Sequence, residues 1–265
     1  MKRWWASLLV LCLVGPAISV SADASGDSGT VAVAGSLFPC VSDLAERYAA
    51  SGGNPPRLVV GSSGKLARQI EAGAPFGLFL SANVEWLEYL ELRGLVGPAE
   101  PLASSPLVLW WPRSAPPDPA LLAGQKRVAI ADPEAAPFGA AAREYLEERG
   151  LYDRLRRGKR LIITATVLQA ALAVQSGGAD LALTALSVAR KLKGGYTVLP
   201  IPSLGHAGAP VLGRMTPPLE DFWRYLRSAE IEAVWREWGF ELPCSDETQR
   251  RSGGAAAAVT SVGGP

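Results

Sequence analysis

Short apolar segments alternate with amphipathic segments along most of the chain. The apolar segments are typical of buried strands, and those between them carry apolar residues at helical spacing. The predicted strands are Val31–Ala34, Leu58–Val60, Leu78–Leu80, Leu107–Trp111, Val128–Ala131, Leu161–Ile163, Leu181–Leu183, Tyr196–Leu199 and Pro210–Leu212. The predicted helices are 41–48, 65–72, Val84–Arg93, Ala140–Arg149, Leu168–Gln175, Phe222–Leu226 and Ile231–Trp238, with a loop at Pro98–Pro106 and a surface connection at Pro112–Pro119. This alternation predicts an α/β protein.

The stretch Arg57–Ser81 is the clearest unit of this pattern. A strand ends at a Gly-Ser-Ser-Gly turn (61–64), a helix begins at Lys65, and the next strand follows it. The turn therefore lies at a helix N-terminus, where unpaired backbone N–H groups, the positive end of the helix dipole and two hydroxyls meet. Such a turn binds an anion without a positively charged side chain.

Two roles for this turn stay open on the residues alone. Ser62 or Ser63 is a suitable N-cap for a helix that binds nothing, and the same turn is a suitable anion site. A nucleotide-binding P-loop is excluded, because Val59 stands where that motif needs its first glycine and Leu66 where it needs Ser or Thr.

A second turn of the same kind follows the first predicted strand. Gly35 and Ser36 precede an amphipathic helix, so Ser36 is placed much as Ser63 is. If the two strands are parallel neighbours, both helix N-termini point to one place at the carboxyl ends of the strands. This convergence favours the anion site over simple capping.

Composition and net charge limit the classes of partner that the protein is expected to bind. The chain of 265 residues has a formal net charge of +1 and 48% hydrophobic residues, which suits one or two folded domains. The charge balance argues against a nucleic-acid or acidic-membrane partner. The basic run 154–160 is interpreted as a solvated surface.

The N-terminus is typical of an export signal. Residues 1–22 hold the basic pair Lys2 and Arg3, an apolar stretch too short to span a bilayer, and a small-x-small cleavage site ending at Ala22. We therefore expect an exported, soluble protein. Its two remaining cysteines, Cys40 and Cys244, are disulfide candidates, and the sequence leaves open whether they pair or stay as thiols.

The sequence offers little for catalysis. It has one histidine, His206, interpreted as a surface or hinge residue, and it lacks zinc-protease and nucleophile-elbow motifs. No serine-protease triad can be assembled around the Gly-Asp-Ser-Gly of the N-terminal linker. We therefore predict a binding protein and not an enzyme.

The order of these motifs resembles that of the molybdate-binding proteins of bacterial ABC importers. The resemblance is strongest in Gly61–Ser81, which reads S-S-G-x-L-A-R-Q-I-E-x-G-A-P before a strand that leads into S-A-N. It continues through 34–37, 131–134 and 137–139, ends with Trp238-Gly239-Phe240, and covers residues 31 to 240.

The resemblance implies a two-lobed periplasmic-binding-protein fold of type II, each lobe a mixed sheet flanked by helices, with the anion held between the lobes. The implied division is a signal peptide (1–22), a linker (23–30), lobe 1 (31–109 plus 205–244), lobe 2 (110–204) and a disordered tail (245–265).

The resemblance also implies a ligand set. Ser36 and Ser63 match serines that donate from hydroxyl and backbone N–H, whereas Phe138 and Val167 match positions that donate only their backbone N–H. These four residues would approach the metal only through the oxygens of molybdate, without direct ligation, and no cofactor is implied.

One position departs from the family pattern. The family usually has a tyrosine whose phenol reaches the oxyanion, and this chain has Ala185 there. Thr166, Thr184 and Ser187 are the candidate substitute donors. The implied function is capture of molybdate or tungstate and delivery to the inner-membrane permease of an ABC transporter by a monomeric protein. The alternatives are the same receptor class tuned to another oxyanion such as sulfate, a sensory anion-binding partner, and an enzyme that uses the cleft.

Overall fold

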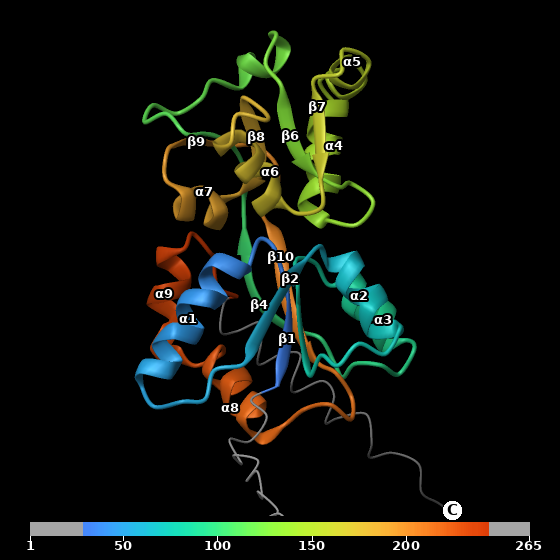
Figure 1. Cartoon of the computed structure of the whole chain (residues 1–265), viewed down its shortest axis with the longest axis vertical. Coiled ribbons are helices and arrows are strands. Elements are labelled where there is room, and N and C mark those ends of the chain that lie inside the picture. Colours follow the sequence, from blue (N-terminus) through green and yellow to red (C-terminus); the bar gives the residue numbers. More distant parts are fainter. Residues whose placement is uncertain (1–28, 244–265) are drawn as a thin grey trace, which may run out of the picture.

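Two five-stranded sheets lie one beyond the other along the longest axis of the molecule (Figure 1). The computed structural model describes residues 29–243. The predicted signal peptide, the linker up to residue 28, Cys244 and the predicted tail lie outside the described residues, so the disulfide stays a prediction.

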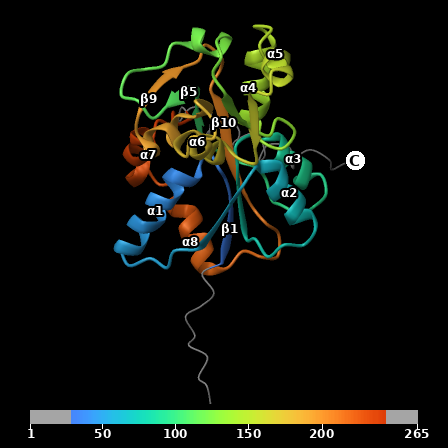
Figure 2. The ribbon, with the colours of Figure 1, turned by 45° about the horizontal axis from the view of Figure 1, so that its top comes forward.

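The first sheet has the strand order β2-β1-β3-β10-β4, with β1, β2 and β3 parallel and β10 antiparallel to both of its neighbours. Its strands are β1 (Thr30–Ala34), β2 (Arg57–Gly61), β3 (Leu78–Ser81), β4 (Glu100–Ser105) and β10 (Leu204–Pro210). Its helices are α1 (Phe38–Ala50), α2 (Ser63–Glu71), α3 (Glu85–Glu91), α8 (Pro217–Tyr225) and α9 (Glu232–Glu237), with a short 3₁₀ turn at Ala229–Ile231. Both ribbon views place α1 and α8 on one side of this sheet and α2 and α3 on the other (Figures 1 and 2).

The second sheet has the strand order β7-β6-β8-β5-β9. Its strands are β5 (Leu107–Trp111), β6 (Val128–Ala131), β7 (Leu161–Thr164), β8 (Leu181–Ala185) and β9 (Gly195–Val198). Its helices are α4 (Pro137–Glu147), α5 (Tyr152–Arg157), α6 (Val167–Gln175) and α7 (Leu186–Leu192), with a 3₁₀ turn at Pro119–Ala123. The parallel strands β6, β7 and β8 are joined by helices. Strand β5 lies between β8 and β9 and runs antiparallel to both.

The buried apolar runs explain why these segments become central strands. Val31–Ala34 and Val128–Ala131 are buried throughout, as expected for strands covered by helices on both faces. The helices bury one stripe each: α2 buries Leu66, Ala67 and Ile70 and leaves Lys65 in solvent. The expected two-lobed α/β fold is confirmed. We call the part built on the first sheet lobe 1 and the part built on the second sheet lobe 2.

The chain passes between the lobes twice, from β4 into β5 and from β9 into β10. The predicted boundary at 109/110 falls inside β5, whose residues 107–111 all pair within the second sheet. The chain therefore passes from the first sheet to the second at Pro106, between β4 and β5. All of β5 belongs to one sheet, because its ladder hydrogen bonds are made there.

Two local expectations were wrong. Residues 100–105 of the expected loop Pro98–Pro106 form β4, an edge strand in which Pro101 is tolerated because one side needs no ladder hydrogen bonds. The expected final strand at 210–212 lies further back, at 204–210, so His206 sits inside β10. Its side chain is 2% exposed, which contradicts a surface position.

Candidate functional site

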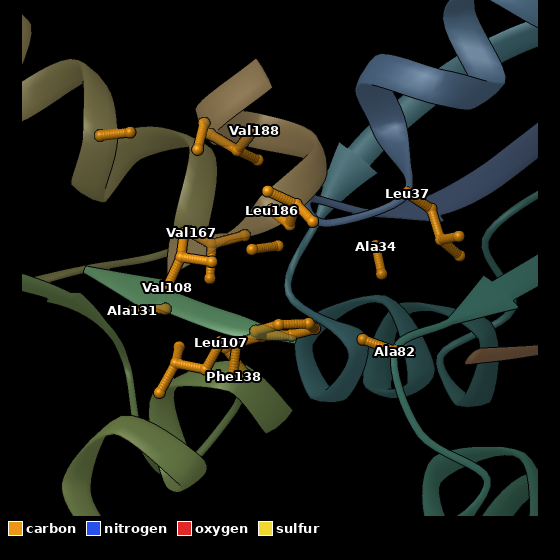
Figure 3. Close-up of a cluster of buried hydrophobic side chains, with 14 of the residues drawn as sticks. Ala34, Leu37, Ala82, Leu107, Val108, Ala131, Phe138, Val167, Leu186 and Val188 are labelled. Carbon is orange, nitrogen blue, oxygen red and sulfur yellow. The ribbon is translucent and has the colours of Figure 1, made fainter. Parts of the chain in front are cut away.

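A small cavity of about 10 Å³ lies where the two lobes face each other. Ala34 and Ala82 approach it from lobe 1, and Phe138 and Val167 from lobe 2 (Figure 3). The full lining is Ala34, Gly35, Ser63, Ala82, Ala136, Pro137, Phe138, Thr166 and Val167. No charged side chain belongs to this lining, so any ion held there would be bound by neutral groups.

Ser63 enters the cavity at the start of α2. It is the first residue of that helix, and its hydroxyl oxygen accepts a hydrogen bond of 3.1 Å from the backbone N–H of Ala82. Of the two serines, Ser62 is the N-cap residue, but its side chain makes no capping hydrogen bond. Ser63 does not cap the helix, and its hydroxyl proton is left for another acceptor.

Ser36 lies directly behind the cavity wall. It is 1% exposed and follows Gly35, which lines the cavity, but Ser36 itself does not belong to the lining. Its hydroxyl lies 2.9 Å from Nε2 of His206, and its carbonyl oxygen accepts a hydrogen bond from the Ser187 hydroxyl. Of the two predicted serine donors, the structure therefore brings Ser63 to the cavity surface and places Ser36 one residue away from it.

Lobe 2 contributes two helix N-termini. Phe138 is the second residue of α4, after Pro137, and Val167 is the first residue of α6. Proline suits the first helical position because its missing N–H would have no intrahelical partner there. Thr166 is the N-cap of α6, and its hydroxyl oxygen accepts a hydrogen bond of 3.2 Å from the backbone N–H of Gln169.

At the cavity, the backbone N–H groups of Ser63, Phe138, Thr166 and Val167 have no backbone acceptor within residues 29–243. Those of Ser63, Phe138 and Val167 lie in the first turn of a helix, where no carbonyl four residues earlier is available. The positive ends of three helix dipoles therefore meet around one cavity. This arrangement favours an anion, because such N–H groups need acceptors and the dipoles stabilise negative charge.

The candidate substitutes for the missing phenol have different surroundings. Ala185 ends β8, is fully buried opposite Leu107 and does not line the cavity. Thr184 donates its hydroxyl to the carbonyl of Val167 at 3.0 Å, and Ser187 donates to Ser36. Thr166 alone among them lines the cavity.

Three contacts, and a close approach of the backbone at Gly35, join the lobes around the cavity. The backbone N–H of Gly64 donates to the carbonyl of Ala135 at 2.9 Å, and Ser187 of α7 donates to Ser36. A Cβ added to Gly35 would stand 3.0 Å from Cβ of Thr166, and the ring centroids of Phe138 and His206 are 5.7 Å apart. The lobes are therefore in contact around the cavity, which stays partly open to solvent.

His206 is the residue that sequence reasoning misplaced. It pairs with Ser36 across 170 positions of sequence and packs edge-on against Phe240 at 5.2 Å between centroids. Burial lowers the pKa of His206 to about 3, so the imidazole is neutral at physiological pH. A lone histidine in a glycine-rich segment carries no signal for this position, because the contact depends on strand pairing between distant segments.

The described part of the chain holds no group of three or more His, Cys, Asp or Glu side chains arranged to bind a metal ion. Over the same residues, every helix is too short or too polar to cross a lipid bilayer.

Comparison with known proteins finds one matching family model and several similar proteins. The family model described as "Bacterial extracellular solute-binding protein" matches residues 30–241. The molybdate-binding protein ModA of Azotobacter vinelandii is 30% identical over 250 residues, which is 89% of this chain and 98% of that protein. The ModA of Escherichia coli (strain K12) is 29% identical over 259 residues, which is 91% of this chain and all of that protein.

The fold is also similar to solved structures. The periplasmic molybdate-binding protein of Azotobacter vinelandii superposes with a TM-score of 0.75 at 27% identity, covering 81% of this chain and 99% of that one. Because this likeness extends over nearly all of the solved chain, it includes both lobes and the crossings between them.

Proposed function

Because this chain belongs to the bacterial extracellular solute-binding proteins and to their molybdate-binding, ModA-like members, we propose that it captures molybdate or tungstate in the cavity between its lobes. The observation that carries the proposal is the set of unpaired backbone N–H groups of Ser63, Phe138 and Val167 at a cavity without charged side chains. The family is one of binding proteins and not of enzymes.

The chemistry of the cavity suits a tetrahedral dianion. Molybdate is fully deprotonated at neutral pH, so it only accepts hydrogen bonds, and the cavity offers donors and no carboxylate. Each hydrogen bond to a charged oxygen contributes about 1.5–3 kcal/mol net. Neutral donors held in a closed site select by size and by acceptor-only character, which disfavours anions that carry a proton.

Ser63 and Ser36 supply the hydroxyl donors of lobe 1 in this proposal, and Phe138 and Val167 the backbone donors of lobe 2. Thr166 takes the part of the phenol that Ala185 does not supply. Its oxygen already accepts from Gln169, which leaves its proton for the anion, and it lines the cavity.

The protein is the substrate-binding component of an ABC transporter. We propose that its partner is the inner-membrane permease, which would recognise the surface formed when the lobes close around the anion. We also propose that it acts in the periplasm as a monomer, after removal of residues 1–22, and that it binds no nucleic acid.

Calorimetric titration of the mature protein with molybdate, tungstate, sulfate and phosphate tests the ligand. We expect molybdate and tungstate to bind with similar affinity, because the two ions are nearly the same size, and sulfate and phosphate to bind much more weakly. Tighter binding of sulfate or phosphate would assign the protein to another oxyanion, an outcome for which Ala185 gives a specific reason. Absence of binding by all four anions would overturn the proposal.

A further inference from the structure

Ser36 and His206 form a buried pair beside the cavity. Their Oγ and Nε2 atoms are 2.9 Å apart, and neither residue is more than 2% exposed. Phe138 and Phe240 both pack against the imidazole. The proposed function uses Ser36 as a donor and gives the histidine no part.

The direction of this hydrogen bond decides what Ser36 is able to do. A neutral imidazole carries one N–H, on either Nε2 or Nδ1. With the proton on Nε2, His206 donates to Ser36 and the serine keeps its own proton for another acceptor. With the proton on Nδ1, Ser36 must donate to Nε2 and has no proton left for an anion.

The surroundings of the ring favour the proton on Nε2. Nδ1 is buried and makes no hydrogen bond with any residue from 29 to 243. A proton on Nδ1 would therefore be a buried donor without an acceptor, and orphaned buried N–H groups are rarer in proteins than under-used acceptors. Burial lowers the pKa of the ring, and the nearby carbonyls of Leu204 and Ala103 act in the opposite direction to a smaller extent, but neither has the geometry of a hydrogen bond with Nδ1.

Building on the proposed function, we propose that His206 is a positioning residue: its Nε2–H donates to Ser36 and turns the serine's own proton toward the bound oxyanion. His206 does not touch the anion and acts through Ser36. Because Phe138 belongs to lobe 2 and His206 to lobe 1, the closure that encloses the anion also covers the imidazole.

The tautomer can be measured directly, because His206 is the only histidine of the chain. In the full mature protein labelled with ¹⁵N-histidine, NMR will show one imidazole, free and with molybdate. We expect the proton on Nε2 in both states. A proton on Nδ1 overturns the inference, and this result does not depend on molybdate being the ligand.

A double-mutant cycle tests the coupling to Ser36. His206→Phe keeps an aromatic ring between Phe138 and Phe240 but removes the donor, and we expect it to weaken molybdate binding about tenfold. In a Ser36→Ala background the same change should cost less than about twofold, because the group that it positions is gone. Equal losses in both backgrounds overturn the inference and indicate a packing role.

Two further variants sharpen this cycle. His206→Gln keeps an N–H donor and should recover part of the affinity that His206→Phe loses. Phe240→Leu changes the packing on the same ring, and its effect should be the same with and without Ser36. Failure of the wild-type protein to bind molybdate would count against the proposed function alone, and the tautomer measurement would then decide the part of His206. If His206→Phe fails to fold, the tautomer measurement alone tests the inference.

Discussion

In the proposed site, the two lobes hold the anion by different means. Lobe 1 contributes the hydroxyls of Ser63, at the cavity, and of Ser36, behind its wall, and each oxygen has a second partner: the N–H of Ala82 for Ser63, and His206 for Ser36. Lobe 2 presents the backbone N–H groups of Phe138 and Val167 at the starts of α4 and α6. In this proposal, lobe 1 adds side-chain hydroxyls to the backbone N–H of Ser63, whereas Phe138 and Val167 of lobe 2 donate only from the backbone.

This difference predicts which substitutions will weaken anion binding. A substitution in lobe 1 removes a donor outright, whereas a substitution at Phe138 or Val167 leaves the donor N–H in place. In lobe 2 the residues that matter are those that start the helices, Pro137 and Thr166, because they determine where the first turn begins. The largest predicted effects follow from this contrast.

Ser63→Ala should weaken molybdate binding by about 10- to 100-fold, because it removes a hydroxyl donor to a charged oxygen. Ser36→Ala should weaken it at least about tenfold for the same reason. Val167→Ala, the matched change in lobe 2, should weaken it by less than about threefold, since its N–H remains. Calorimetry on the three variants checks this, and equal losses for Ser63→Ala and Val167→Ala would contradict the contrast.

Thr166→Val should weaken molybdate binding about tenfold and lower the free energy of unfolding by about 1 kcal/mol. The change keeps the side-chain shape but removes both the donor proposed for the anion and the acceptor for the N–H of Gln169. Thr166→Ser, which keeps the hydroxyl, is the control. Calorimetry and denaturant unfolding separate the two effects, and a loss of stability without a loss of affinity would leave Thr166 as a helix cap only.

Gly35→Ala should weaken binding about fivefold, because the new Cβ would stand 3.0 Å from Cβ of Thr166 in the closed protein. The contact joins the lobes, so the cost falls on closure and not on the open state. Gly205→Ala is the control, since a Cβ there meets nothing within 4 Å. Calorimetry and small-angle scattering with molybdate measure affinity and closure, and an unchanged affinity would mean that the lobes close less tightly around the anion.

The remaining prediction concerns how stability depends on pH. Burial lowers the pKa of His206 from its ordinary value of 6.5 to about 3, so the unfolded chain binds a proton that the folded one does not between these values. The contribution of His206 to the free energy of unfolding should therefore be fully present above the unfolded pKa. It should fall by about 1.4 kcal/mol per pH unit as the pH drops from about 6.5 toward 5.

Urea unfolding at several pH values from about 7 to 5 measures this slope, in a range where carboxylates contribute little. His206→Phe should remove it, since no other histidine is present. A slope of the same size in that variant would show that the proton uptake belongs to another group.

The sequence by itself determined the class of fold and the place of the anion-binding turns. Apolar strands, amphipathic helices and the small residues between them are local signals, and they placed the N-termini of α2 and α6 within a few residues. Ser63, Phe138 and Val167 follow from those local signals and from the family resemblance, because a helix start supplies its free N–H groups wherever it forms.

Only the tertiary structure decided how the two halves meet. The pairing of β10 with β3 and β4 places His206 next to Ser36, and the contact between the lobes places Ser187 against Ser36 and Thr166 at the cavity. These contacts join segments far apart in the chain. Neither the period of apolar residues nor a motif encodes such pairings, because the free energy that selects them comes from packing of the whole molecule.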